Sequence, residues 1–297
     1  MQKNKLLMNR LFITCSFLMV FLTLAQGQLL LNRSSQQIED ELLFNRSFLL
    51  HNNIKSISAE YMVKKDWQGL SNFGDKVQYR FDESGNLVYK KEASLIANKW
   101  ETTEFSYLYD RDNKLIEESS RRKEGYWVKE YKYSNVSGNV IEVVNYLVGV
   151  EPENNKRVEL NRQVFKWETL NDSTIQKSIA NNYGLPYLVI TYQYDSAGKY
   201  MKSEKHHFVV TGEKKEIVYS YNKFGWLESV NSGGKISSFL YDEYGNVIEV
   251  SQMEGGRQVK HVEYLYKVNG LLEAQLKTEN ESSTIHILKY RIEHFID

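Results

Sequence analysis

Residues able to bind a metal or perform acid–base chemistry are present in this sequence, but their spacing does not assemble a recognisable site. His206-His207 are adjacent, and adjacent residues of a strand point to opposite faces. His261, His286 and His294 lie in separate segments, without the spacing of a zinc site. Acid pairs such as Glu117-Glu118 could share a cleft only if the strand register brought them together. We therefore predict no metal, no cofactor and no catalytic residue.

The sequence also shows no motif of a catalytic nucleophile and no phosphate-binding loop. Cys15 is the only cysteine, and it lies in an apolar stretch expected to be removed on export. Gly233-Gly234 and Gly255-Gly256 are not followed by Lys-Ser or Lys-Thr, so they predict hairpin tips rather than phosphate loops. We expect a non-enzymatic protein. The alternative is a secreted carbohydrate-active hydrolase with its acids on a sheet face.

Four tryptophans are the better candidates for contacting a ligand, because they lie at or near loops or strand ends, where packing explains an exposed ring less well. They are Trp67, Trp100, Trp127 and Trp226. The tyrosines are expected to hold strands in register instead, since cross-strand aromatic pairs stabilise a sheet by about 0.2–1 kcal/mol each. The predicted partner is a glycan or a cell-surface protein.

The N-terminus resembles a signal peptide. Lys3 and Lys5 precede an apolar run over residues 11–24, which is shorter than the roughly 20 residues of a membrane-spanning helix. Ala25-Gln26-Gly27 supplies small residues for cleavage after Gly27. We expect residues 1–27 to be removed, no membrane span to remain, and the protein to be secreted, periplasmic or on the outer surface of a bacterium, since the mature chain would then contain no cysteine.

Composition favours strands and argues against nucleic acid. The chain carries 38 basic and 38 acidic residues, so no excess positive charge attracts a polyanion. Only 2 prolines accompany 21 tyrosines and 13 phenylalanines, a balance typical of an all-β protein.

Aromatic pairs separated by one residue recur along the chain and predict repeated hairpins. Their second members follow one another at intervals of 20 to 34 residues, enough for two strands and two connections. The pairs are Tyr79/Phe81, Tyr107/Tyr109, Tyr131/Tyr133, Phe165/Trp167, Tyr192/Tyr194, Tyr219/Tyr221, Phe239/Tyr241 and Tyr264/Tyr266.

Turn chemistry follows most of these pairs. An Asp or Asn side chain can accept hydrogen bonds from nearby backbone N–H groups, and Gly tolerates the left-handed conformation that closes such loops. We predict structural turn roles for Asp82, Gly85, Asp110, Asp195, Gly198, Gly225, Asp242 and Gly245.

The repeated pattern Tyr-x-Tyr-Asp-x-x-Gly-Asn-Val/Leu-Ile resembles the YD repeat of the RHS family of bacterial secreted and surface proteins. The resemblance covers roughly residues 76–297. It implies an elongated, twisted antiparallel sheet of β-hairpins, here without the C-terminal toxin of large members and too short to close a large shell. An outer-membrane barrel is the alternative, but Lys129-Glu130-Tyr131-Lys132-Tyr133 places charge on both strand faces.

Residues 28–53 differ from the rest and are assigned to an N-terminal lead or cap. Ser34 and Gln37 resemble a helix capping box, and Ile38 and Leu42 follow at helical spacing. One short helix is expected there, before a hairpin-repeat domain over residues 54–297.

Overall fold

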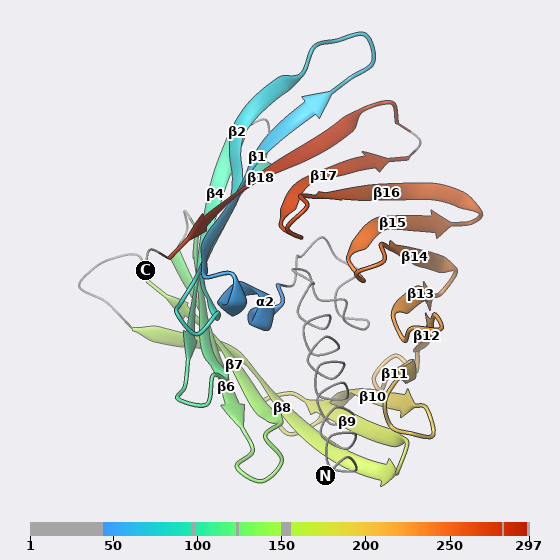
Figure 1. The fold of residues 1–297 in the computed structure, drawn as a ribbon. Coiled ribbons are helices and arrows are strands. Elements are labelled where there is room, and N and C mark those ends of the chain that lie inside the picture. The colour runs from blue at the N-terminus through green and yellow to red at the C-terminus, as the bar shows by residue number, and fades with distance from the viewer. Residues whose placement is uncertain (1–43, 97–98, 123–124, 150–155, 281, 296–297) are drawn as a thin grey trace, which may run out of the picture.

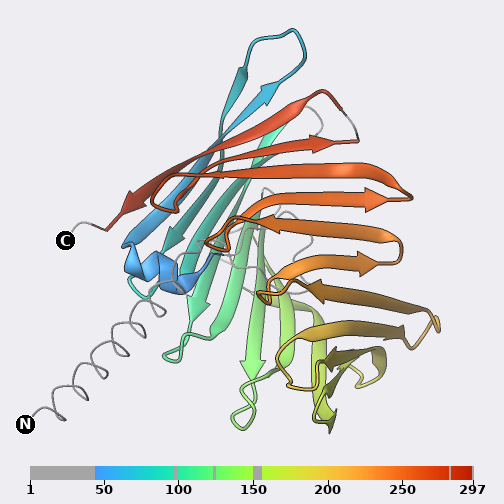
Figure 2. The same cartoon turned by 45° about the vertical axis from the view of Figure 1, so that its right-hand side comes forward.

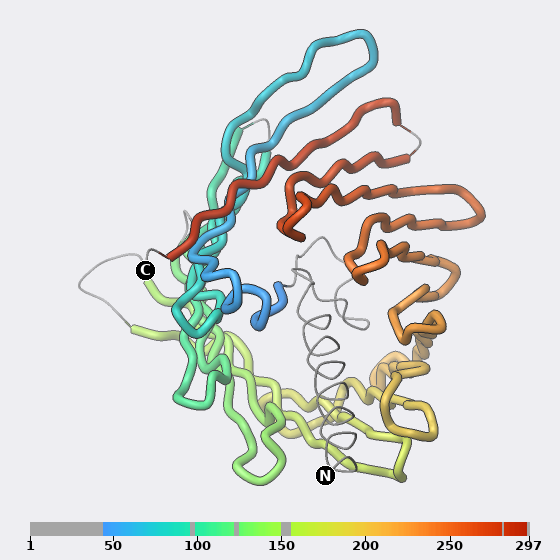
Figure 3. Tube along the Cα trace, in the orientation of Figure 1, coloured from blue at the N-terminus to red at the C-terminus, as the bar shows by residue number. Residues whose placement is uncertain are grey.

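The strands form one closed antiparallel barrel. The computed structural model describes residues 44–96, 99–122, 125–149, 156–280 and 282–295. Within them, eighteen strands and one short helix, α2 (Arg46–His51), follow in sequence (Figure 1). The ring of strands is seen from a second side in Figure 2, and the continuous course of the chain around it in Figure 3.

Each strand pairs with its neighbours in sequence, so every connection is a hairpin. The strands are β1 (Ile54–Lys64), β2 (Ser71–Phe81), β3 (Leu87–Ile96), β4 (Lys99–Tyr109), β5 (Leu115–Arg122), β6 (Gly125–Tyr133), β7 (Val140–Val148), β8 (Arg157–Asn171), β9 (Thr174–Ala180), β10 (Pro186–Tyr194), β11 (Met201–Phe208), β12 (Lys214–Tyr221), β13 (Leu227–Ser232), β14 (Lys235–Tyr241), β15 (Val247–Glu254), β16 (Arg257–Tyr266), β17 (Leu272–Glu279) and β18 (Ile285–His294).

Closure comes from the first and last strands. β1 pairs with β2 on one side and with β18 on the other, where Ala59 lies opposite Tyr290 and Lys64 opposite Ile285. The expectation of an elongated, open sheet is therefore wrong. An open array would leave the backbone N–H and C=O groups of two edge strands unpaired, and closure pairs them with each other.

The inner wall carries the apolar and aromatic residues. α2 lies inside the ring of strands in the view of Figure 1, and its buried Phe48 and Leu49 pack in one cluster with Tyr79 and Tyr290. Since side chains alternate along a strand, the first aromatic of each recurring pair continues this inner face around the ring. Tyr192 and Tyr219 belong to two further buried clusters on that face.

The outer wall carries networks of charge. Glu130 is the neighbour of inner-wall Tyr131, so it points outward, where it pairs with Arg157. Arg162 on the same wall bridges Glu142 and Glu159 at 3.0 and 2.8 Å. An Arg or Lys facing lipid at mid-membrane costs about 2–4 kcal/mol. This part of the outer wall therefore suits water. Elsewhere the outer wall carries exposed apolar side chains, among them Leu108, Leu240 and Leu265.

The hairpin turns at one end share a side-chain staple. Oδ1 of Asp82 accepts hydrogen bonds from the N–H groups of Ser84 and Asn86 at 2.9 and 2.8 Å, and Gly85 between them has φ +72°. Asp110, Asn222 and Asp242 accept equivalent pairs of bonds, with Asn113, Gly225 and Gly245 at positive φ. Asp195 accepts from the N–H groups of Lys199 and Tyr200, in a turn one residue longer, with Gly198 at positive φ.

Tyrosine hydroxyls join several hairpins to the preceding one. The second aromatic of a pair donates to a backbone carbonyl at the start of an earlier strand, as Tyr109 does to Leu87 at 3.0 Å and Tyr241 to Leu227 at 2.6 Å. The indole of Trp167 makes the same bond to Val140 at 2.8 Å. These bonds satisfy carbonyls beside the turns and connect consecutive repeats.

One short helix, α2, lies within residues 28–53, the segment assigned to the N-terminal lead or cap. The expected helical segment from Ser34 to Leu42 and the cleavage site after Gly27 lie outside the described residues. α2 begins after Asn45, whose Oδ1 accepts from the N–H groups of Ser47 and Phe48. Of the residues that the structure describes, none forms a helix long and apolar enough to span a membrane.

Candidate ligand-binding site

A cavity of about 460 Å³ opens on the inner wall, at the strand ends remote from the Asp–Gly turns. Val77 and Tyr79 place it on the inner wall, because both belong to the cluster that packs against α2. It is lined by Tyr61, Val63, Phe73, Lys76, Val77, Tyr79, Lys90, Glu92, Leu95, Trp100, Gln275, Lys277, Glu279, His286 and Leu288.

Three rings gather in this cavity from three strands. The centroid of Tyr61 on β1 lies 5.6 Å from that of Phe73 on β2 and 6.0 Å from that of Trp100 on β4. Phe73 and Trp100 are themselves 6.3 Å apart and remain 50% and 41% exposed. The cluster is thus an open aromatic surface rather than a filled core.

Polar groups border the rings. The Tyr61 hydroxyl lies 2.6 Å from Nδ1 of His286, and their rings are stacked with centroids 5.9 Å apart. Burial raises the pKa of Tyr61, with smaller effects from Lys277 and Glu279, so the hydroxyl stays protonated at neutral pH. Lys90 pairs with Glu92 at 3.1 Å and Lys277 with Glu279 at 2.7 Å.

Lys76 reaches the cavity through a β-bulge. Val77 pairs with Ala59 and Asp75 with Glu60, so β2 holds one more residue than β1 across this step, and that residue is Lys76. A bulge redirects a side chain that regular alternation would send to the other face. The ammonium lies 5.1 Å from the Trp100 ring centroid and 5.6 Å from that of Tyr61.

The four predicted ligand-contact tryptophans have different surroundings. Only Trp100 lies in the cavity. Trp67 is fully exposed in the loop after β1, with φ +60°, and Trp127 on β6 is 40% exposed. Trp226 packs against Phe224 and Tyr241, with ring centroids 5.0 and 5.2 Å away, so it is part of a turn's packing.

Sequence patterns did not single out Tyr61, Phe73 or Lys76. The segment around Gly69 and Gly74 resembles a polar loop, whereas β2 begins at Ser71 and Gly74 sits in an irregular strand at φ +85°. A second register shift between Glu60 and Met62 accompanies it. The position of a bulge depends on how a strand pairs with its partner, so the sequence of β2 alone does not show it. The sequence signal in this segment is Phe73 followed by Gly74 in a polar stretch.

The acid pair Glu117-Glu118 is divided between the two faces of the barrel wall. Glu117 pairs with Arg157 outside, whereas Glu118 accepts a hydrogen bond from Tyr131 inside, so this acid pair shares no cleft. Buried Glu204 accepts from Tyr219 at 3.1 Å and lies 3.0 Å from Nε2 of His206. Across the described residues, no group of His, Cys, Asp and Glu is arranged to hold a metal ion.

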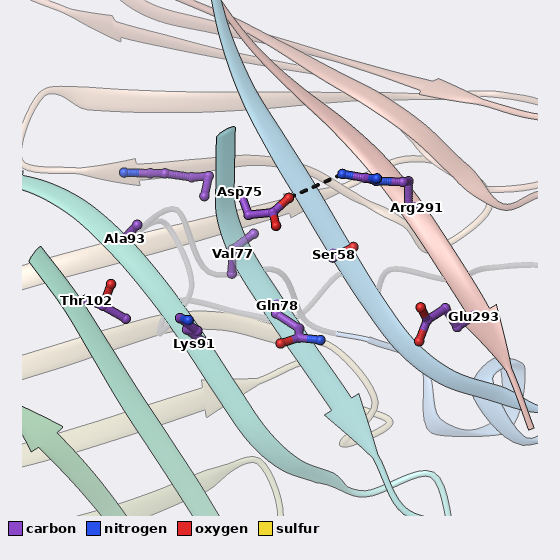
Figure 4. Close-up of a pocket in the computed structure, with 10 residues that line it drawn as sticks. Ser58, Asp75, Val77, Gln78, Lys91, Ala93, Thr102, Arg291 and Glu293 are labelled. Atoms are coloured by element: carbon purple, nitrogen blue, oxygen red, sulfur yellow. Dashed lines mark hydrogen bonds and ion pairs between the residues drawn. The ribbon is translucent and has the colours of Figure 1, made fainter. Parts of the chain in front are cut away.

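A second cavity of about 410 Å³ lies on the outer wall over β1, β2, β3, β4 and β18 (Figure 4). Its lining is polar, with Ser58, Gln78 and Lys91 from neighbouring strands. Arg291 crosses it to Asp75 at 3.3 Å and also pairs with Glu60. Because its one arginine is already paired and it contains no ring, we regard this groove as part of the charged outer wall.

Comparison with solved structures finds similar chains, and one of them is a barrel of very different sequence. A porin-like protein from Bacteroides uniformis ATCC 8492 aligns over 81% of this chain and 98% of that chain, with a TM-score of 0.40 and 10% identity. A likeness at that score supports no statement about this protein's function. No family model and no curated protein matches the sequence.

The identification with the RHS/YD-repeat family is wrong. Its implied architecture was an open array of hairpins, but β1 and β18 close the strands into one ring. The recurring Tyr-x-Tyr-Asp pattern specifies the hairpin turn and the tyrosine-to-carbonyl bond, and any antiparallel sheet of successive hairpins can use both.

Proposed function

We propose that this protein is an exported, non-enzymatic binding barrel of the bacterial envelope or exterior, and that it binds a glycan at the cavity of Tyr61, Phe73 and Trp100. The observation that supports this is the cluster of three rings left open on the inner wall. Ligand cavities are concave, largely apolar or aromatic, and contain a few placed polar groups, which is the composition found here.

A sugar suits this cavity for two reasons. The C–H face of a pyranose can stack on an aromatic ring, and the ring's exposed apolar area is removed from water when it does. Gln275 and the Tyr61–His286 pair provide polar groups able to bond hydroxyls beside the rings. A folded protein partner would need a broad surface, which an inner-wall cavity of this size does not present.

Export is supported by the N-terminal sequence. N-terminal sequencing of protein secreted from an expressing bacterium should find Gln28 as the first residue, and the protein should remain monodisperse without detergent because charge networks cover part of its outer wall. Retention of Met1, or aggregation that only detergent reverses, would contradict this part of the proposal.

Glycan binding is tested with two matched tryptophan variants. A panel of neutral and acidic oligosaccharides is screened by calorimetry, and every ligand that binds is repeated with Trp100→Ala and Trp127→Ala. The two indoles are equally exposed, at 41% and 40%, but only Trp100 lies in the cavity. We expect Trp100→Ala to weaken binding at least tenfold and Trp127→Ala to leave it unchanged, with both variants folded by circular dichroism.

The same incubations separate binding from hydrolysis. If shortened saccharides appear, and Glu92→Gln or Glu279→Gln abolishes their release, the hydrolase alternative is correct. Absence of binding across the panel, or equal weakening by the two tryptophan variants, would refute the proposed site.

A further inference from the structure

The cavity contains one lysine that lacks a carboxylate partner. Lys90 and Lys277 each lie within 3.1 Å of a glutamate oxygen. Lys76 has no carboxylate oxygen within 4.0 Å among the described residues, and its ammonium lies over the faces of Tyr61 and Trp100. Three lysines and two glutamates therefore leave one positive charge in the lining, located at the rings.

The backbone directs this charge toward the cavity. Lys76 is the extra residue of the bulge, while its neighbour Asp75 points to the outer wall and pairs with Arg291 (Figure 4). Without the bulge, alternation from inner-wall Val77 would place Lys76 outside with Gln78. A bulge interrupts the hydrogen-bond ladder between two strands. Here the bulge fixes the backbone so that the Lys76 side chain faces the inside of the barrel.

The ammonium is also incompletely hydrated. Burial lowers the pKa of Lys76, and the charge of Glu92 opposes this effect in part. Cation–π contacts with two rings compensate only part of a lost hydration shell. An anionic group that bound beside the rings would replace the lost water contacts of the Lys76 ammonium with a charge-assisted hydrogen bond.

We propose that Lys76 binds the acidic group of an anionic saccharide, a carboxylate or a sulfate, while Tyr61, Phe73 and Trp100 contact its sugar rings. This inference rests on the proposed glycan site and adds the chemical class of its ligand. In this proposal the bulge, the Lys76 ammonium and the exposed rings all serve to bind an anionic saccharide.

Two matched ligand pairs test the charge. Oligogalacturonate is compared with its methyl ester, and a sulfated chondroitin oligosaccharide with its desulfated form, by calorimetry at low and high salt. We expect at least one acidic member to bind tenfold or more tightly than its neutral partner, with the preference reduced by salt. The pair that shows the preference identifies carboxylate or sulfate as the group bound.

Two charge-removing variants test the residue. Lys76→Met should abolish the preference for the acidic member, so that the acidic and neutral members bind with equal affinity. Lys91→Met removes the same charge from an exposed position on the outer wall, one strand away, and should change neither affinity. Lys76→Arg should retain the preference.

The possible results distinguish this inference from the proposed function. If both members of each pair bind equally and Trp100→Ala weakens both, the glycan site stands and the role of Lys76 is refuted. The role is also refuted if Lys76→Met and Lys91→Met reduce the preference equally. Failure of every saccharide to bind would overturn both proposals.

Discussion

Trp226 lies directly against Gly245, so close that a Cβ on the glycine would be 2.9 Å from Cζ2 of the indole. The two residues belong to successive hairpin turns on the same end of the barrel. This contact gives Trp226, one of the four tryptophans predicted to contact a ligand, a packing role, because its ring covers the next turn.

Gly245→Ala should destabilise the protein for two reasons. The residue has φ +86°, where an L side chain costs about 1–2 kcal/mol, and the added methyl group would collide with Trp226. Gly184→Ala is the matched control, since Gly184 has φ +74° but no atom within 4 Å of its Cβ position. Urea denaturation should show a larger loss for Gly245→Ala by about 1 kcal/mol or more. Equal losses of unfolding free energy for the two variants would show that the Trp226 ring moves aside without a cost in stability.

Tyr266→Phe should destabilise the barrel by about 1 kcal/mol. The Tyr266 hydroxyl donates to the Val247 carbonyl at 3.0 Å. Leaving a buried carbonyl without its donor costs about 1–3 kcal/mol, and the lower end of that range applies here because the bond is only partly buried. Tyr183→Phe provides the comparison, because that ring is 81% exposed on a hairpin tip. Denaturation midpoints that shift equally for the two variants would argue against a structural role for the tyrosine-to-carbonyl bonds.

Closure changes what is expected of Tyr79. In an open array this residue would lie near a fraying end, but in the barrel it is 5% exposed and packs with α2. Tyr79→Ala should cost at least as much as Tyr221→Ala, toward the upper part of the roughly 3–5 kcal/mol typical of aromatic core truncations.

Hydrogen exchange tests the same closure on the parent protein. Amides of β1 and β18 that pair with each other should exchange as slowly as those of β10 and β11, because all four strands have neighbours on both sides. Rapid exchange confined to β1 and β18 would indicate two free edges and would contradict the ring.

Alkaline pH should unfold the barrel. Burial raises the pKa of Tyr109 to about 12, from an ordinary value of 10.0, and raises the pKa of Tyr131, Tyr219 and Tyr266 as well. A raised folded-state pKa contributes stability that is complete below pH 10 and is lost as the pH rises toward and beyond 12. The last tyrosines to ionise should therefore do so together with the loss of circular dichroism. Complete tyrosinate formation near pH 10 with unchanged circular dichroism would contradict this expectation.

The all-β class and the position of the hairpins were predictable from the sequence, because each hairpin depends on a few neighbouring residues. Asp82, Gly85 and the aromatic pair before them define one turn within about seven residues, and the same chemistry recurs at Asp242 and Gly245. Such local geometry does not depend on how many hairpins follow or on where the last strand ends.

Closure and the candidate site were decided only by the tertiary structure. The pairing of Ala59 with Tyr290 joins residues more than two hundred positions apart, and it follows from twist and stagger accumulated over eighteen strands of the described chain. Lys76 turns inward because β2 carries one residue more than β1 at that point, a mismatch between two strands that neither segment shows alone. Trp100 meets Tyr61 for the same reason: register and ring curvature, set by all the strands together, determine which loop-proximal aromatics face one cavity.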